Sequence, residues 1–354
     1  MKILILTRYT RMGASSRLRF HQYLPLWEAA GITCDTVPLL NEQYLEDLYA
    51  QRPVQKKNLL RCYARVFGAL RRARAYDAVV VEKEVFPFLP PLAEAWLRFM
   101  RVPYIVDYDD AIFHNYDLHS SRLVRFVLGS KIRYVMRKAA LVVCGNAYLE
   151  TYAREAGANH TAVIPTVIDA DRYRVKDRKA DAPVVIGWIG SPSSLKYLDA
   201  LSPVLDELTA AYPAKVHIIG GKSGIGLGDR ESVLEWTEEK EGDLIEALDI
   251  GIMPLEDSPW ERGKCGYKLI QYMGCGLPVV GSPVGVNREI IAEGVNGFSA
   301  VGAGEWKERL ERLIGDAGLR RSMGAEGRKL VVDKYALDRA AGVWIAHLKS
   351  VKRK

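Results

Sequence analysis

Short apolar runs alternate with helix-length segments along this 354-residue chain, and this alternation restricts the fold more than any other feature. The runs occupy residues 2–7, 78–83, 104–108, 141–146, 184–190, 215–221, 250–255 and 278–283. Strands that alternate with helices are joined by crossover connections and therefore pair in parallel. The sequence predicts an α/β protein with parallel sheets.

A polar stretch divides these runs into two sets. It reads DADRYRVKDRKADAP over residues 169–183. We predict a Rossmann-like domain over 1–170, a linker over 171–183, a second Rossmann-like domain over 184–335, and a helix over 336–354 that packs back on the first domain. Ligands of open parallel sheets bind outside the carboxyl ends of the strands. Two such domains would face each other across a ligand-binding cleft.

A glycine-punctuated stretch in the second half, residues 264–292, predicts a helix followed closely by a buried strand. The segment 268–273 contains no Pro or Gly, and Gly274 and Gly276 can end a helix there in the left-handed conformation. A helix that starts just after Gly266 has first-turn amides that can hold an anion.

Composition excludes several classes of protein. With 49% hydrophobic and 26% charged residues, the chain is globular. Its five cysteines form no C-x-x-C pair, so neither a disulfide framework nor a zinc site is indicated, and a cytoplasmic location fits best. The apolar run Ile3–Leu6 is too short for a signal peptide, and no stretch approaches the ~20 apolar residues of a membrane span. Any membrane contact would be peripheral.

The positive charge lies in the first half of the chain. Residues 1–175 carry 25 Lys and Arg against 17 Asp and Glu, a net +8, while residues 176–354 carry 25 against 26. The excess concentrates in residues 56–76 and 122–138, where apolar residues repeat at helical spacing. Such a helix can pack its apolar stripe on a core and show its cations to water, or it can lie on an anionic membrane surface.

Two phosphate-binding motifs fail in this sequence. A dinucleotide site needs G-x-G-x-x-G after the first strand, but the segment TRYTRMGASSRLRF (7–20) contains only Gly13. The segment GGKSGIGLG (220–228) contains Gly-Lys-Ser, but Val216 stands where a phosphate loop requires glycine. We interpret it as a turn at a strand end.

Several segments together resemble a known family. ALDIGIMPL (247–255), the stretch 264–292 and GVNGF (294–298) resemble the donor-binding region of retaining glycosyltransferases of the family 4 type, which have the two-domain GT-B fold. The segments around Gly13, at 145–158 and at 186–201 match in the expected order. The resemblance implies that the second domain binds the donor and the first the acceptor.

The resemblance also assigns residues to the donor, a nucleotide-diphosphate sugar. The donor-binding residues would be Gly13, Ala14, Gly190, Ser191, Lys196, Lys264, Gly266, Tyr267, Lys268 and Gln271. Amides near Gly266 and Tyr267, with Lys268, would face the sugar or the diphosphate, and Lys196 would balance the charge of the leaving diphosphate. On the acceptor side the resemblance places Arg17 and Arg19. No cofactor and no metal is expected.

Three carboxylates are the catalytic candidates: Asp109, Asp110 and Glu261. The first two follow a strand end in VDYDDAIF (106–113), where active-site residues gather. They could instead cap the following helix, and a metal site at 107–109 is the less favoured reading.

The family commonly has two Glu separated by seven residues, and this chain departs from that pattern. The positions hold Gly263 and Gln271 here. Gln271 can hydrogen-bond a ribose diol but carries no charge, and Glu261 would take over the sugar contact.

The sequence thus predicts a retaining glycosyltransferase that moves a sugar from a UDP- or GDP-sugar to a glycan or lipid-linked acceptor, in bacterial-type surface polysaccharide or glycolipid assembly. Its other partner would be an anionic membrane surface. Two alternatives stay open: a non-catalytic protein that binds a nucleotide sugar, and a nucleotide-sugar epimerase. No nucleic-acid partner is expected, because no stacking-aromatic motif accompanies the basic charge.

Overall fold

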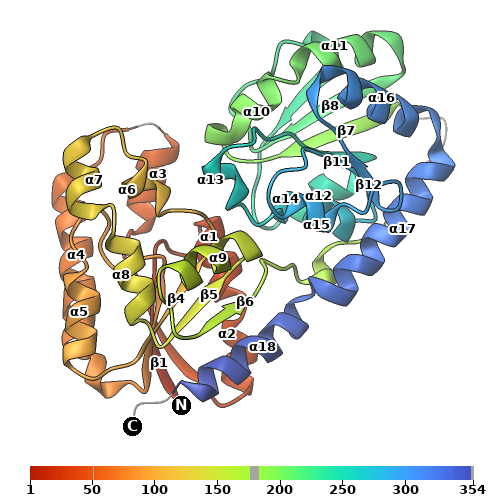
Figure 1. The fold of residues 1–354 in the computed structure, drawn as a ribbon. Helices are drawn as coiled ribbons and strands as arrows, with labels where there is room; N and C mark the ends of the chain where they lie inside the picture. The colour runs from red at the N-terminus through yellow and green to blue at the C-terminus, as the bar shows by residue number, and fades with distance from the viewer. Residues whose placement is uncertain (51, 176–182, 352–354) are drawn as a thin grey trace. The chain divides into compact units, whose positions relative to one another are not determined.

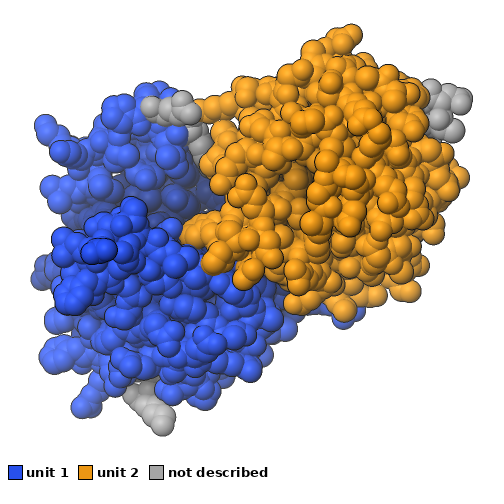
Figure 2. Space-filling model, turned by 45° about the horizontal axis from the view of Figure 1, so that its top comes forward, with its two compact units in different colours: residues 1–166, 263–265, 338–354 blue, residues 167–262, 266–337 orange. Residues whose placement is uncertain are grey.

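The computed structural model describes residues 1–50, 52–175 and 183–351, which form two compact units. Unit 1 comprises residues 1–166, 263–265 and 338–354, and unit 2 comprises residues 167–262 and 266–337 (Figure 2). The division falls four residues before the predicted end of the first domain at 170. Residues 176–182 of the predicted linker lie outside the described residues. Each unit is described by itself.

Unit 1 contains a parallel sheet with the strand order β2-β1-β3-β4-β5-β6 (Figure 1). Its strands are β1 (Lys2–Thr7), β2 (Thr33–Pro38), β3 (Ala78–Glu82), β4 (Tyr104–Tyr108), β5 (Leu141–Cys144) and β6 (Thr161–Val163). Strands β1, β3, β4 and β5 are buried almost throughout, so they are the four runs that hydrophobicity alone identifies.

Helices cover both faces of this sheet (Figure 1). They are α1 (Ala14–Ser16), α2 (Leu24–Ala29), α3 (Glu42–Tyr49), α4 (Lys56–Arg71), α5 (Leu92–Phe99), α6 (His114–Asp117), α7 (Arg122–Leu128), α8 (Lys131–Lys138), α9 (Ala147–Glu155) and α18 (Leu337–Ser350). In α18, the Trp344 ring lies 5.6 Å from Trp27 and 6.4 Å from Tyr23, centroid to centroid.

Unit 2 contains a second parallel sheet with the order β12-β11-β10-β7-β8-β9. Its strands are β7 (Val184–Ile189), β8 (Ala214–Ile219), β9 (Glu231–Leu234), β10 (Ile250–Met253), β11 (Val279–Gly281) and β12 (Gly297–Ser299). The predicted fold class, α/β with two Rossmann-like domains as in GT-B proteins, is confirmed by these two sheets and their flanking helices.

The helices of unit 2 enclose a separate apolar core on each face of this sheet. They are α10 (Leu195–Asp199), α11 (Ser202–Ala211), α12 (Glu241–Glu246), α13 (Pro259–Arg262), α14 (Tyr267–Gly274), α15 (Asn287–Ile290), α16 (Gly302–Gly315) and α17 (Ala317–Lys334). Among the helices described for the two units, none is long and apolar enough to cross a membrane.

The glycine-punctuated stretch folds as α14 and β11, as predicted. Its glycines act differently from one another. Gly276 follows the helix with φ +69°, the left-handed conformation predicted for it. Gly274 is the last helical residue, and a Cβ there would lie 2.4 Å from Ile168 Cδ1, so this glycine permits close packing instead. The segment 220–228 follows β8 as a turn, also as predicted.

Candidate functional site

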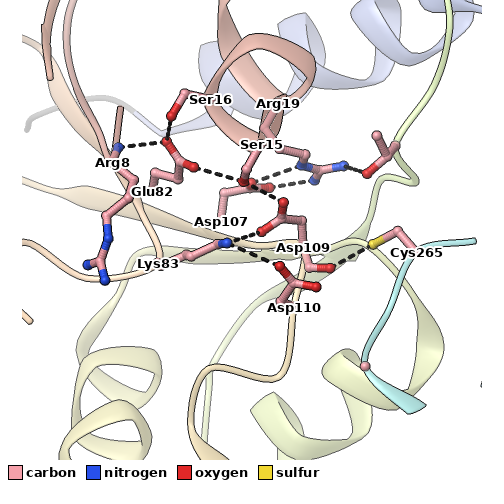
Figure 3. Close-up of polar contacts among 12 residues, drawn as sticks. Arg8, Ser15, Ser16, Arg19, Glu82, Lys83, Asp107, Asp109, Asp110 and Cys265 are labelled. Atoms are coloured by element: carbon pink, nitrogen blue, oxygen red, sulfur yellow. Dashed lines mark hydrogen bonds and ion pairs between the residues drawn. The ribbon is translucent and has the colours of Figure 1, made fainter. Parts of the chain in front are cut away.

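In unit 1 the predicted polar residues gather at the carboxyl ends of β1, β3 and β4 (Figure 3). The chain leaves β1 toward β2 on one side, while β3 lies on the other, so β1 and β3 flank the switch point of the sheet. Open parallel sheets bind their ligands at such a point.

Glu82, the last residue of β3, fastens the loop that follows β1. Its carboxylate accepts hydrogen bonds from the Ser15 hydroxyl at 2.8 Å, the Ser16 hydroxyl at 2.6 Å and the Arg8 amide at 2.7 Å. Glu82 is 1% exposed, and burial raises the pKa of its carboxyl group. The sequence analysis missed this residue, although its place at a strand end was a signal that could have found it.

The loop held by Glu82 carries Gly13 and Ala14. A Cβ at position 13 would lie 2.4 Å from Tyr9 Cβ, so glycine lets the loop fold tightly here. Ala14 is exposed and begins α1. The hydroxyl of Ser15, the next residue, also lies 2.5 Å from Asp109 Oδ2, so the Glu82 and Asp109 carboxylates share its single proton. The structure therefore brings the predicted phosphate-facing loop beside the predicted catalytic pair.

Lys83 joins the two aspartates of that pair. Its ammonium lies 2.9 Å from Asp109 Oδ1 and 3.3 Å from Asp110 Oδ2 (Figure 3). Burial alone would raise the pKa of Asp109, but the Lys83 ammonium and the Ser15 hydroxyl outweigh it, and the pKa lies below its ordinary value. Asp109 is thus held ionised. Lys83 itself has φ +65°, a conformation that a non-glycine residue adopts only where its surroundings enforce it.

The helix-capping alternative for Asp109 and Asp110 is wrong. The helix that follows them, α6, begins after Phe113, three residues further on, and has no side-chain cap. The two carboxylates bond to Lys83 instead, so they belong to the carboxyl edge of the sheet.

Arg19, predicted on the acceptor side, lies wholly buried. Its guanidinium donates to both carboxylate oxygens of Asp107, at 2.9 and 2.5 Å, and to the Ile164 carbonyl at 2.8 Å. Burial raises the pKa of Asp107, and Arg19 only partly offsets this effect. Arg17 is also buried, at 3% exposure. Arg19 therefore positions the end of β4 and engages both oxygens of Asp107.

Residues 263–265 cluster with unit 1. The Asn146 side-chain amide donates to the Gly263 carbonyl at 2.9 Å and to the Lys264 carbonyl at 3.0 Å, and the Cys265 thiol donates to the Asp109 carbonyl at 2.9 Å (Figure 3). A Cβ at position 263 would lie 2.5 Å from Ala111 Cβ. A glutamate therefore does not fit at the first family position without rearrangement. Lys264 is partly exposed.

In unit 2 the switch point lies between β7 and β10, and two predicted donor-binding residues meet there. Gly190 follows β7, and Lys268 lies in the first turn of α14. The Lys268 ammonium stands 4.2 Å from the centroid of the buried Trp188 ring, and a Cβ at position 190 would lie 2.6 Å from that ammonium. Gly190 thus leaves room for the lysine. Ser191 is exposed, and its hydroxyl lies 2.9 Å from that of Ser193.

The start of α14 is built on a glycine cap. Gly266 is the N-cap residue and has φ +63°, and a Cβ there would lie 2.4 Å from Ile290 Cδ1. Only glycine suits this position. The first-turn amides of a helix have no acceptor within it and favour a negative ligand. Tyr267 and Lys268 are both partly exposed at this end.

Glu261 lies in α13 and is 5% exposed. Its carboxylate accepts hydrogen bonds from the Tyr197 and Ser258 hydroxyls. Tyr197 stands beside Lys196 in α10, and the exposed Lys196 ammonium lies 4.8 Å from the centroid of its ring. The structure therefore brings Glu261 and Lys196 to the same part of unit 2. Tyr197 also lines a cavity of about 440 Å³ at the carboxyl ends of β10, β11 and β12.

Gln271 belongs to a buried polar chain that the sequence analysis missed. Its amide donates to the Tyr173 hydroxyl at 3.2 Å, and that hydroxyl donates to Glu241 at 2.6 Å. The Trp236 ring nitrogen donates to the other oxygen of Glu241 at 2.8 Å. Tyr173 and Glu241 are far from Gln271 in sequence, so no local pattern could have linked them.

Comparisons with known proteins show what the chain is similar to. Residues 183–316 match the family model described as glycosyl transferases group 1. This part of the chain is therefore similar to the group 1 glycosyltransferases. Over 215 residues the chain is 26% identical to the D-inositol 3-phosphate glycosyltransferase of Geodermatophilus obscurus, a match that covers 50% of this chain and 46% of that protein. The match thus spans about half the length of that curated relative.

Two solved structures share the whole fold. Sucrose-phosphate synthase from Thermosynechococcus elongatus superposes with a TM-score of 0.73 at 15% identity, covering 99% of this chain and 98% of that one. The Anabaena protein HepE, in complex with UDP-glucose, superposes with a TM-score of 0.71 at 18% identity, covering 99% of each chain. At such low identity these likenesses establish the two-domain fold alone.

Proposed function

We propose that this protein is a retaining glycosyltransferase that moves a sugar from a UDP- or GDP-sugar to a glycan or lipid-linked acceptor. One observation carries the proposal: at the switch point of unit 2, Gly190 makes room for the Lys268 ammonium, which stands at the glycine-capped start of α14. A cation, first-turn amides and a close-approach glycine together suit a diphosphate. The likeness to a protein solved with UDP-glucose supports this choice of donor.

The donor would be held by unit 2. Lys268 and the first-turn amides would take the charge that develops on the diphosphate as the glycosidic bond breaks. The exposed Lys196 would add a second cation. Glu261, kept in place by Tyr197 and Ser258, would accept hydrogen bonds from the sugar hydroxyls. Gln271 would support the ribose end through Tyr173 rather than by a charge of its own.

The transfer step would follow a front-face course. The bond between the sugar C1 and the diphosphate oxygen breaks, the acceptor oxygen bonds to C1 from the same face, and the acceptor proton passes to the departing diphosphate. No protein nucleophile is needed. Asp109, held ionised beside Lys83, would orient an acceptor hydroxyl, and Asp110 would take part through the same lysine.

No metal or cofactor is part of this proposal. Both oxygens of Asp107 are engaged by Arg19, so the sequence from 107 to 109 does not present two available carboxylates. The cations of unit 2 would balance the charge of the diphosphate. Transfer should therefore persist when EDTA is present.

The acceptor would belong to bacterial-type surface polysaccharide or glycolipid assembly. The net charge of +8 on residues 1–175 supports an anionic partner for unit 1. Because Arg17 and Arg19 are buried, they would serve the acceptor site by shaping the loop after β1.

The test is transfer from UDP- and GDP-sugars to a panel of glycan and lipid-diphosphate acceptors, with Lys268→Met as the decisive variant. The variant should lose roughly 100-fold in rate, as when one preorganised charge donor is removed from an active site. Lys307→Met changes an exposed lysine of α16 and is the matched control. The anomeric configuration of the product, read by NMR, tests retention.

Other outcomes separate the two alternatives. Binding of UDP or GDP without transfer to any acceptor would favour the non-catalytic protein. Conversion of the sugar while the diphosphate bond stays intact would favour the epimerase. Equal rates for wild type and Lys268→Met would contradict the donor site.

A further inference from the structure

Three helices of unit 1 turn large apolar side chains toward the solvent. On α5 these are Leu92, Trp96 and Phe99, spaced four and three residues apart, and the Trp96 and Phe99 rings stack at 5.7 Å. Phe99 is 75% exposed. The other side of α5 packs on the sheet through Ala93 and Leu97. The helix is therefore apolar on both sides, which burial in unit 1 does not explain.

The same feature recurs on α7 and α4. On α7, Leu123 is 70% exposed and Phe126 is 89% exposed, with Val127 beside them. On α4, Leu60 and Phe67 are exposed. From helical spacing alone, these two residues would also fit an apolar stripe that packs on the core. Exposed apolar patches of this kind on a soluble domain mark sites of interaction.

Topology places these helices on one side of the sheet. The connections β2–β3, β3–β4 and β4–β5 contain α4, α5 and α7, and all three cross the sheet in the same direction. Right-handed crossovers therefore put them on the same face. Figure 1 shows α4, α5, α7 and α8 gathered on one side of the sheet of unit 1, with α2 and α18 on the other.

The segments before α5 and α7 also meet. The exposed Phe88, which precedes α5, lies 6.2 Å from His119, which precedes α7, between ring centroids. The Phe86 ring in turn stacks on Tyr63 of α4 at 5.0 Å. Ring contacts therefore join the segment before α5 to the segment before α7 and to α4, on the face of the sheet that the three helices share.

Charge selects the partner that fits this region. Helices α4, α5 and α7 carry eight Lys and Arg, and all eight are exposed. Their one acidic residue, Glu94, is 2% exposed and accepts the Val85 amide. We define the apolar–basic surface as the side chains Leu60, Phe67, Leu92, Trp96, Phe99, Leu123, Phe126 and Val127 with these eight cations.

We propose that the apolar–basic surface docks unit 1 on an anionic lipid bilayer, with its apolar side chains entering the interface and its cations meeting the headgroups. Helices that combine exposed Leu, Phe and Trp with Lys and Arg bind membranes in this way. The proposal deepens the proposed function and rests on it in one respect: docking would bring unit 1 to the membrane that holds a lipid-linked acceptor. The binding itself needs neither donor nor acceptor.

Sedimentation with vesicles tests the proposal without any sugar transfer. The vesicles contain phosphatidylglycerol and phosphatidylcholine, or phosphatidylcholine alone. The wild type should bind the anionic vesicles and lose most of that binding in high salt. A variant with Phe99→Ser, Leu123→Ser and Phe126→Ser should bind at least about tenfold less, because lost apolar area weakens insertion.

Two further variants make the test specific. Lys57→Gln, Arg61→Gln and Arg98→Gln together should reduce binding and its salt dependence. Val295→Ser, Val301→Ser and Val332→Ser remove three exposed apolar residues from unit 2 and should leave binding unchanged. All substituted residues are exposed, and thermal unfolding checks that each variant folds.

Several results would overturn the proposal. These are absence of wild-type binding, equal binding by the Phe99, Leu123 and Phe126 variant, or an equal loss in the unit 2 control. Equal binding to neutral vesicles would contradict the role of the cations. Self-association that the serine substitutions abolish would assign the surface to a second copy of the chain. A failure of sugar transfer would leave all of these readouts unaffected.

Discussion

The carboxyl edges of the two sheets use charge in opposite ways. In unit 1 the charged groups bond to one another: Arg19 with Asp107, and Lys83 with Asp109 and Asp110. In unit 2 the cations Lys196 and Lys268 stand over aromatic rings, next to a glycine turn and a helix start. Unit 1 thus has an edge whose charges hold one another, whereas the cations of unit 2 lie against aromatic rings at the edge where we propose that the diphosphate binds.

This difference teaches what a charged residue at a strand end can mean. A buried ion pair holds loops in a defined geometry and keeps a group in one protonation state, as Lys83 does for Asp109. A cation over an aromatic ring is attracted by the ring and keeps its charge. We therefore expect substitutions in unit 1 to act first on stability, and substitutions in unit 2 to act first on ligand binding and rate.

The largest expected effect is on the stability of unit 1. Arg19→Met leaves Asp107 buried without its cation and should cost roughly 3–5 kcal/mol in the free energy of unfolding. Arg154→Met is the matched control, because its ion pair with Glu150 is exposed and should contribute less than about 1 kcal/mol. Chemical denaturation measures both.

The pH dependence of Arg19→Met gives a second readout. Without Arg19 the pKa of Asp107 rises further, so below that raised pKa the folded variant holds a proton that the unfolded chain has already released above pH ~4. Its stability should therefore fall as pH rises, and its deficit relative to wild type should shrink toward pH ~4. A deficit that does not change with pH would argue against an uncompensated Asp107.

The next effect tests Glu261 of unit 2. Glu261→Ala should lower the transfer rate by about 100-fold while nucleotide affinity changes little, because its proposed contact is to the sugar. Transfer kinetics and calorimetric binding of UDP or GDP separate the two quantities. Glu256→Ala, also in unit 2 but exposed, is the control. Full activity of the Glu261 variant would remove this residue from the proposed site.

The smallest effect concerns the space beside Lys268. Gly190→Ala brings a Cβ within 2.6 Å of the Lys268 ammonium and of the Trp188 ring. The buried ring does not yield, so the lysine moves, and affinity for the nucleoside diphosphate should fall about tenfold. Gly304→Ala adds a methyl group where nothing lies within 4 Å and should have no effect. If Gly190→Ala leaves the affinity for the nucleoside diphosphate unchanged, the proposed difference between the carboxyl edges of the two sheets is weakened.

Local sequence predicted the central strands and missed the edge strands. The eight apolar runs all correspond to strands inside the sheets, where both faces are buried. The missed strands are β2, β6, β9 and β12, which are the two outer strands of each sheet. An edge strand has a less buried face and needs no continuous apolar run, so hydrophobicity alone does not distinguish it from a loop.

The candidate site was predictable only in part, for a similar reason. The glycine-punctuated stretch pointed to Gly266 and a strand end pointed to Asp109, because turns and strand ends leave local signals. Gly190 was named through the family resemblance alone. The partners of these residues carry no such signal. Lys83 and Glu241 are ordinary charged residues in the sequence, and only the fold brings them to Asp109 and Tyr173.

The sequence by itself determined the two-domain α/β fold and the glycine-capped start of α14, because strand periodicity and backbone freedom are local properties. Only the tertiary structure decided what each charge contacts. Arg19 and Lys268 are both basic residues in the sequence. In the structure Arg19 is buried against a carboxylate, whereas Lys268 lies over an aromatic ring beside a glycine. Burial and partner distance set what a charge does, and both depend on residues far apart in the chain.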